Sequence, residues 1–266
     1  MDGTVSASEV VGRGRLAGRR CVITGVGKSI GRAIAISLCD EGARVVGVGR
    51  SEDDGRRFEA EMRAAGRDFR FVGADVSVER DVGDLAVAVM DWLGGVDVIV
   101  NNAGVAAGKP LLDTTDDEWD AVLTIGPRGT FLVVRELGRM LPASGGSIIN
   151  IASSGGLVAL PNMAAYCASK GAVVAMTRSM AVDLAPETRV NALCPDAVDG
   201  SLSWETYADV PGMPGEEVDE AFAAANLAER SGEPVDVASF AVFLASDESR
   251  FVTGGVFTVD GGFAAV

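Results

Sequence analysis

Short apolar runs alternate with longer amphipathic segments along almost the whole of this 266-residue chain. The apolar runs are continuous, which is typical of strands buried on both faces, and the segments between them repeat apolar residues at helical spacing. Strands that are joined by helices run parallel, because each helix carries the chain back to the edge of the sheet where the strands begin. The pattern therefore restricts the chain to a parallel α/β fold.

The expected strands cover residues 21–24, 44–49, 69–74, 96–100, 147–151, 190–193 and 256–259. The expected helices cover residues 30–42, 53–65, 79–93, 116–141, 166–185 and 234–245, and the fourth of these is interrupted at Gly126 and Pro127. Right-handed crossovers make a doubly wound sheet the simplest arrangement. We therefore predict a Rossmann-like three-layer α/β/α sandwich with a mainly parallel sheet of about seven strands.

The predicted organisation is an N-terminal tail over residues 1–16 and a single domain over residues 17–266. One irregular segment, at about residues 196–230, follows the sixth strand and contains Pro-Gly pairs at 211–212 and 214–215. Ligands of open α/β sheets bind beyond the carboxyl ends of the strands, so this segment is a candidate substrate lid. Its Trp204 and Tyr207 are candidate substrate contacts, and apolar side chains of this kind suit an apolar substrate. The acidic residues of the segment would repel an anionic substrate.

Composition excludes several classes of function. The chain has no histidine, which rules out Ser-His-Asp triads and imidazole metal sites, and no metal is expected. Cys21, Cys39, Cys167 and Cys194 lack the paired spacing of a zinc site, and we expect reduced thiols in a cytoplasmic protein. The net charge of −15 repels phosphate, so neither nucleic acid nor a membrane is an expected partner.

A glycine-rich turn follows the first strand and opens the first helix. In such a turn, backbone amides and the positive end of the helix can hold a pyrophosphate. We expect cofactor contacts from Gly25, Lys28, Ser29, Ile30 and Gly31. A tight strand-to-helix turn without any ligand would show the same pattern, so the turn alone does not decide the function.

The second strand ends in Gly49 and Arg50. A dinucleotide fold that binds free ribose hydroxyls usually has an acidic residue here. A guanidinium instead suits a 2′-phosphate, and Lys28 adds a second positive charge. We therefore predict NADP(H) as the preferred cofactor and keep NAD(H) as the alternative.

Tyr166 and Lys170 stand four residues apart at the start of an expected helix, which places them on one face. A nearby ammonium lowers the pKa of a phenol, which makes Tyr166 a candidate acid and base. Ser153 lies just beyond the fifth strand and is placed to hydrogen-bond a reacting oxygen. We predict Ser153, Tyr166 and Lys170 as the catalytic residues, and Ser153 and Tyr166 as substrate contacts.

Taken together, these motifs resemble the short-chain dehydrogenase/reductase family over about residues 17–263, and Asn101-Asn102-Ala103-Gly104 matches a further family segment. The resemblance implies hydride transfer between a nicotinamide cofactor and a ketone or aldehyde, with Tyr166 passing the proton. It implies that Lys170 lowers the pKa of Tyr166 and holds the nicotinamide ribose. It also implies a homo-oligomer, a tetramer or a dimer. The cofactor contacts that it implies are Asp75, Val76, Asn102, Ala103, Gly104, Tyr166, Lys170, Pro195, Asp196 and Val198.

Four positions depart from the family pattern. Ser29 replaces the second glycine of the turn, Gly126 replaces an asparagine, Asp196 replaces a glycine, and Gly200 replaces a threonine. Pro127 has no N–H to donate, so we expect a kink in its helix. These departures leave two alternatives open: an isomerase or dehydratase with altered chemistry, and a non-catalytic nucleotide-binding scaffold.

Overall fold

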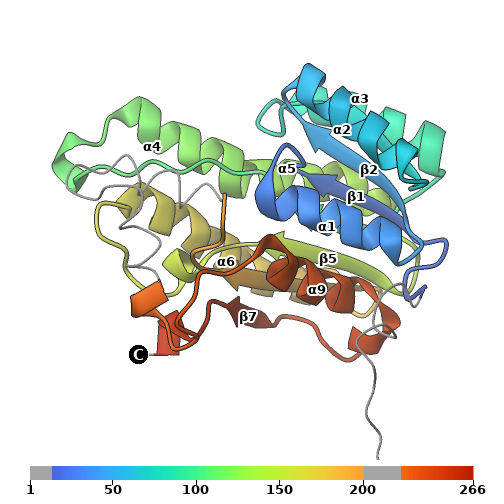
Figure 1. Cartoon of the computed structure of the whole chain (residues 1–266). Coiled ribbons are helices and arrows are strands. Elements are labelled where there is room, and N and C mark those ends of the chain that lie inside the picture. The colour runs from blue at the N-terminus through green and yellow to red at the C-terminus, as the bar shows by residue number, and fades with distance from the viewer. Residues whose placement is uncertain (1–13, 201–222, 266) are drawn as a thin grey trace, which may run out of the picture.

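A computed structural model describes residues 14–200 and 223–265. Within these residues a seven-stranded sheet has the order β3-β2-β1-β4-β5-β6-β7, and every neighbouring pair runs parallel (Figure 1). The predicted doubly wound α/β fold is confirmed. The strands are β1 (Arg20–Thr24), β2 (Arg44–Gly49), β3 (Phe69–Gly73), β4 (Val98–Asn101), β5 (Gly146–Ile151), β6 (Thr188–Pro195) and β7 (Val256–Val259).

Helices alternate with these strands as the pattern predicts. The longer ones are α1 (Ser29–Asp40), α2 (Glu52–Ala64), α3 (Glu79–Leu93), α4 (Asp116–Leu123), α5 (Gly129–Leu137), α6 (Ala164–Asp183) and α9 (Pro234–Ala245). Short 3₁₀ turns occupy Leu111–Asp113, Gly138–Met140, Ser154–Gly156, Asp247–Ser249 and Phe263–Ala265. No helix in the described part of the chain is both long and apolar enough to span a bilayer.

The strand order places a topological switch point between β1 and β4. From β1 the chain builds outward through β2 to β3, and it then returns to the other side of β1 to form β4. The connections that leave β1 and β4 therefore turn away from each other and open a crevice at the carboxyl edge of the sheet. The glycine-rich turn after β1 lies at this crevice.

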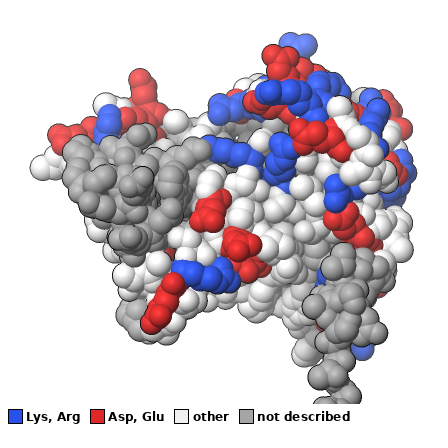
Figure 2. Space-filling view, viewed as in Figure 1, with Lys and Arg blue, Asp and Glu red and all other residues white. Residues whose placement is uncertain are grey.

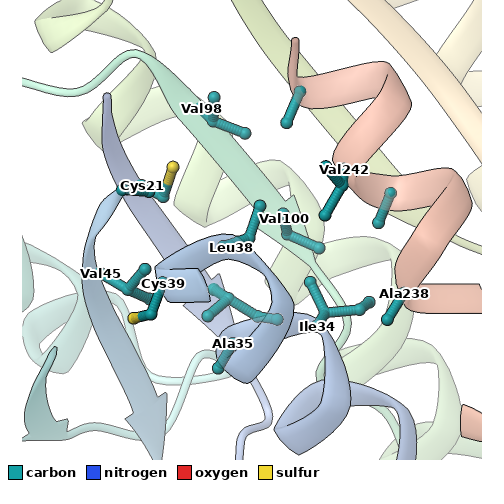
Figure 3. Packing of buried hydrophobic residues seen from close by; sticks show 14 of the residues in the cluster. Cys21, Ile34, Ala35, Leu38, Cys39, Val45, Val98, Val100, Ala238 and Val242 are labelled. Carbon is teal, nitrogen blue, oxygen red and sulfur yellow. The ribbon is translucent and has the colours of Figure 1, made fainter. Parts of the chain in front are cut away.

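Two apolar layers hold helices on opposite faces of the sheet. One layer joins α1, α2 and α9 to the sheet, and Figure 3 shows Ile34 and Leu38 of α1 facing Ala238 and Val242 of α9. The other layer joins α3, α5 and α6 to the sheet. Both faces of the sheet are covered, which explains why its strands read as continuous apolar runs.

The described end of the expected tail packs onto the domain. Leu16 is fully buried in the layer formed by α1, α2 and α9. Arg15 forms an ion pair with the buried Glu41, with 2.5 Å between its Nη2 and the Glu41 Oε1. The folded unit therefore includes these two residues of the expected tail.

The helix expected over residues 116–141 consists of α4, a π-helical turn at Thr124–Arg128, and α5. Pro127 lies inside this turn. Because Pro127 has no N–H, the Leu123 carbonyl loses its α-helical partner, and the backbone widens at this point. The expected interruption at Gly126 and Pro127 is confirmed, and it takes the form of a π-helical turn.

We predict that Leu38→Ala lowers the free energy of unfolding by about 2–5 kcal/mol, because it removes a fully buried side chain between α1 and α9. Urea denaturation followed by circular dichroism measures the change. The control is Val87→Ala on the exposed side of α3, where we expect a change below about 0.5 kcal/mol. Equal midpoints for the two variants would contradict the packing described here.

Candidate active site

A cavity of about 750 Å³ lies at the carboxyl edge of the sheet. It extends from the β1–α1 turn and the end of β2, past the end of β4, to the first turns of α6. Most of the residues predicted to bind cofactor or substrate line it: Gly25, Lys28, Ser29, Ile30, Gly31, Arg50, Asp75, Val76, Asn102, Ala103, Gly104, Ser153, Tyr166, Lys170, Pro195 and Asp196.

Of the predicted site residues that the structure describes, Val198 is the one that does not line the cavity. Val198 is buried and pairs with Gly232 in an isolated bridge, so its role as a cofactor contact stays a prediction. Its side chain packs in the apolar layer that joins α1, α2 and α9 to the sheet. Trp204 and Tyr207 lie outside the described residues. The sequence reading missed these lining residues: Val48, Ser51, Asp54, Phe71, Ala74, Val105, Ile125, Ile151 and Ala152.

The β1–α1 turn depends on a close approach between two glycines. Gly25 has a φ of +77°, and a side chain on Gly31 would collide with the Gly25 carbonyl oxygen. The Asn102 side-chain amide donates to that same oxygen at 2.9 Å. The N-cap residue of α1, Lys28, makes no side-chain capping bond, and the first turn of α1 has no acidic residue. This N-terminus therefore suits an anion, because its amides and helix dipole point into the cavity.

Ser29 stands at the second glycine position with a φ of +42°, a backbone conformation that non-glycine residues rarely adopt. Its hydroxyl donates to the Asp199 carbonyl at 2.8 Å. This hydrogen bond connects the β1–α1 turn to the segment that follows β6. Gly200 also has a left-handed φ, +61°, which a β-branched threonine would adopt only with strain.

Arg50 lies at the other end of the cavity from Tyr166 and is 63% exposed. Its Nη1 is 3.9 Å from the Asp75 Oδ2. Other basic side chains around α1 and α2 lie among acidic ones, as Figure 2 shows, and Arg56 and Arg63 both pair with Glu59. Arg50 makes a longer ion pair than these, so its guanidinium is placed to meet an anion in the cavity.

Ser153, Tyr166 and Lys170 converge at the α6 end of the cavity, and all three are buried. Ser153 follows β5, and its hydroxyl accepts a hydrogen bond from the Gly155 N–H at 3.1 Å. The Lys170 Nζ donates to the Ile151 carbonyl at 2.9 Å and lies 5.7 Å from the centre of the Tyr166 ring. The helical spacing of four therefore brings phenol and ammonium together as predicted.

Burial controls the protonation of this pair. It raises the pKa of Tyr166 to about 12, and a hydrogen bond with Ser153 opposes part of that rise. It also lowers the pKa of Lys170 to about 8. The expected lowering of the Tyr166 pKa by Lys170 is therefore wrong for this structure, because desolvation favours the uncharged form of both groups.

Gly126 is buried in the π-helical turn against α6. A side chain at this position would collide with the Ser169 hydroxyl, which donates to the Val122 carbonyl at 3.1 Å. Ser169 thus fills the space that a side chain at position 126 would need. The absence of a side chain at Gly126 leaves room for the Ser169 hydroxyl of α6. The asparagine of the family pattern would not fit here without a change at Ser169.

Asp196 follows Pro195 at the end of β6, lines the cavity and is half-buried. Its Oδ1 accepts a hydrogen bond from Ser154, whose side chain is fully buried. Burial raises the pKa of Asp196, while the hydrogen bonds from the Ser154 hydroxyl and the Ala197 N–H oppose the rise. The carboxylate is therefore anchored at the wall of the site.

The described residues form neither a metal site nor a disulfide. They contain no group of three or more Cys, Asp or Glu side chains that is arranged to hold a metal ion. All four cysteines are free: Cys21, Cys39 and Cys194 are buried, and Cys167 is half-buried. Burial raises the pKa of the Cys194 thiol to about 11, which keeps it protonated near neutral pH.

Comparisons with known proteins agree with this arrangement. The protein family described as enoyl-(acyl carrier protein) reductase matches residues 25–264. A 2-(S)-hydroxypropyl-CoM dehydrogenase of Xanthobacter autotrophicus is 37% identical over 254 residues, which cover 95% of this chain and 99% of that protein. An NADP-dependent (R)-specific alcohol dehydrogenase of Lentilactobacillus kefiri is 39% identical over 257 residues, which cover 94% of this chain and 98% of that protein.

A solved structure also resembles this one. The crystal structure of a gluconate 5-dehydrogenase from Burkholderia cenocepacia, in complex with NADP and tartrate, matches with a TM-score of 0.88 and 31% sequence identity. The match covers 96% of this chain and 98% of that one. The likeness therefore extends over the sheet, its helices and the cavity edge.

We predict that Tyr166 stays protonated at pH values where an ordinary tyrosine ionises. The chain has two tyrosines, so the variant Tyr207→Phe leaves Tyr166 as its single phenol. With a pKa of about 12, roughly 1% of Tyr166 is ionised at about pH 10, where an ordinary tyrosine is half ionised. Tyrosinate absorbance during an alkaline titration measures this fraction.

The control for this titration is the same variant unfolded in guanidinium chloride, where the midpoint should return to about 10. The Tyr166→Phe variant reports the remaining tyrosine. Half-ionisation of folded Tyr207→Phe near pH 10 or below would show that burial does not control this phenol.

Proposed function

The chain belongs to the short-chain dehydrogenase/reductase family, and we propose that it is an NADP(H)-dependent oxidoreductase that interconverts a ketone or aldehyde with an alcohol. The observation that carries the proposal is the single cavity that joins the uncapped N-terminus of α1 to Ser153, Tyr166 and Lys170. One end of that cavity suits phosphate, and the other holds groups that handle a proton. A dinucleotide that spans the cavity would place its reactive end beside Tyr166.

The residues of the cavity fit a nicotinamide dinucleotide. The Gly25–Gly31 turn offers backbone amides to a pyrophosphate, and Arg50 with Lys28 offers positive charge at the adenosine end. NADP is bound in the gluconate 5-dehydrogenase structure, and the Lentilactobacillus relative is named as NADP-dependent. These similarities favour a 2′-phosphate as the group that meets Arg50. NAD(H) remains the alternative cofactor.

When bound, the nicotinamide exchanges a hydride with the carbon of the substrate's carbonyl or alcohol group. Tyr166 gives a proton to the substrate oxygen in reduction and takes one from it in oxidation. Ser153, which is hydrogen-bonded to Tyr166, orients that oxygen. Lys170, held by the Ile151 carbonyl, faces the same end of the cavity and is placed to hold the ribose.

The substrate class follows from charge and from the walls of the cavity. Val105 and Ile125 add apolar surface to its lining, which suits an apolar ketone or alcohol. The net charge of −15 disfavours an anionic substrate. We therefore propose an apolar small molecule without negative charge. The chemistry of carbonyl and alcohol interconversion agrees with the dehydrogenase names of the relatives.

We predict that NADPH binds more tightly than NADH, and that Arg50→Ala removes most of the difference. Loss of a charge-assisted contact to the 2′-phosphate is worth about 1.5–3 kcal/mol, or roughly tenfold to hundredfold in NADPH affinity. Nicotinamide fluorescence during parallel titrations measures the dissociation constants of NADPH and NADH.

The matched control is Arg63→Ala, because Arg63 is 61% exposed and lies in the last turn of α2, away from the cavity. This variant should bind both cofactors like the wild type. Tighter binding of NADH by the wild type would overturn the NADP(H) assignment and leave the oxidoreductase proposal in place.

We predict that Tyr166→Phe lowers kcat by about 10²–10⁴-fold, because it removes the proton donor and keeps the ring. Cofactor affinity and thermal unfolding of the variant should match the wild type. The assay is NADPH consumption with a panel of apolar ketones. Unchanged turnover in Tyr166→Phe would remove Tyr166 from the chemistry. A wild type that binds NADPH and turns over no carbonyl compound would favour the scaffold alternative.

A further inference from the structure

Asp196 is a carboxylate at the reacting end of the cavity, and the proposed oxidoreductase mechanism gives it no role. The cavity runs from Arg50 and Asp75 past the β1–α1 turn to Ser153 and Tyr166. If the phosphates lie at the turn and the proton-transferring group is Tyr166, the nicotinamide must lie at the Tyr166 end. Asp196 lines the same cavity next to Ser153 and Tyr166, so its charge would lie near a nicotinamide ring bound at that end.

Hydrogen bonds hold the Asp196 carboxylate in place. The Ser154 hydroxyl donates to its Oδ1, and the Ala197 N–H also donates to it. Ser154 is fully buried and belongs to the 3₁₀ turn that directly follows Ser153. The turn that positions the catalytic serine therefore also positions this carboxylate, and its hydrogen bonds oppose part of the rise in pKa that burial causes.

The other charged groups at this end do not cancel Asp196. Burial lowers the pKa of Lys170 to about 8, so its positive charge weakens as the pH rises through that value. Asp260 has the same sign as Asp196, and its two carboxylate oxygens accept the N–H groups of Gly262 and Ala264. Tyr166 stays neutral, because burial raises its pKa to about 12. The local charge therefore becomes net negative at mildly alkaline pH.

Resting on the proposed function, we propose that Asp196 selectively stabilises the oxidised, positively charged nicotinamide and so biases the bound reactants toward carbonyl reduction. In reduction, a bound nicotinamide would supply a hydride, that is, one proton and two electrons, to the carbonyl carbon, and the Tyr166 hydroxyl would supply the proton that the substrate oxygen gains. The ring passes from neutral to cationic. A half-buried carboxylate beside it lowers the energy of the cationic state alone, because the neutral ring has no net charge to attract.

A carboxylate that stabilises the cationic ring changes the ratio of the NADP⁺ and NADPH affinities. We expect Asp196→Asn to lower the affinity for NADP⁺ relative to NADPH by about tenfold, measured by calorimetry at about pH 8. A tenfold change in this ratio equals about 30 mV in the potential of the bound two-electron couple. Asparagine keeps the size of the side chain and an acceptor for Ser154, so only the charge is removed.

Two further variants complete the experiment. Asp196→Gly removes the same charge and restores the residue of the family pattern, so it tests the inference should the asparagine variant fold poorly. Asp91→Asn removes one carboxylate from the exposed face of α3 near its C-terminal end, which is far from the cavity. We expect the Asp91 variant to keep the affinity ratio of the wild type.

A lowered ratio in both Asp196 variants, with no change in the Asp91 variant, supports the inference. Ratios within about twofold of the wild type in both Asp196 variants overturn it, and the proposed oxidoreductase function then still stands. If the wild type binds neither form of the cofactor, the proposed function fails and this inference fails with it.

Discussion

The site depends on the close backbone contact between Gly25 and Gly31. This contact lets α1 begin directly at the carboxyl edge of β1, where its amides face the cavity. The Asn102 side-chain amide donates to the Thr24 and Gly25 carbonyls at 3.1 and 2.9 Å. These hydrogen bonds connect the residue after β4 to the same turn and stabilise it. A side chain at Gly31 would collide with the Gly25 carbonyl oxygen, so the turn would have to open and the end of the cavity that it lines would change shape.

At the other end of the cavity, the loss of solvent around Tyr166 and Lys170 controls their protonation. Tyr166 and Lys170 are both buried, and burial favours the neutral form of each. A neutral phenol is a proton donor, and a lysine with a pKa of about 8 is partly uncharged at mildly alkaline pH. The enclosure of the pair therefore has a larger influence on its proton chemistry than the mutual attraction expected from a spacing of four residues.

Three of the four residues that depart from the family pattern contact a residue from a distant segment of the chain. Gly126 is accommodated by Ser169, whose hydroxyl occupies the space of a side chain at 126. Ser29 donates to the Asp199 carbonyl, and Asp196 accepts from Ser154. Each pair joins segments that are far apart in the chain, so a substitution at one position changes what its partner can do.

The sequence by itself determined the fold and most of the site, because the strand and helix periodicities are local and the motifs lie at strand ends. It predicted the parallel order of elements, the interruption at Gly126 and Pro127, and most of the described residues that meet in the cavity. Only the tertiary structure decided which way Val198 points, what Ser29 and Asp196 bind, and the direction of the Tyr166 pKa shift. These properties depend on burial and on contacts between distant segments, which no local pattern encodes.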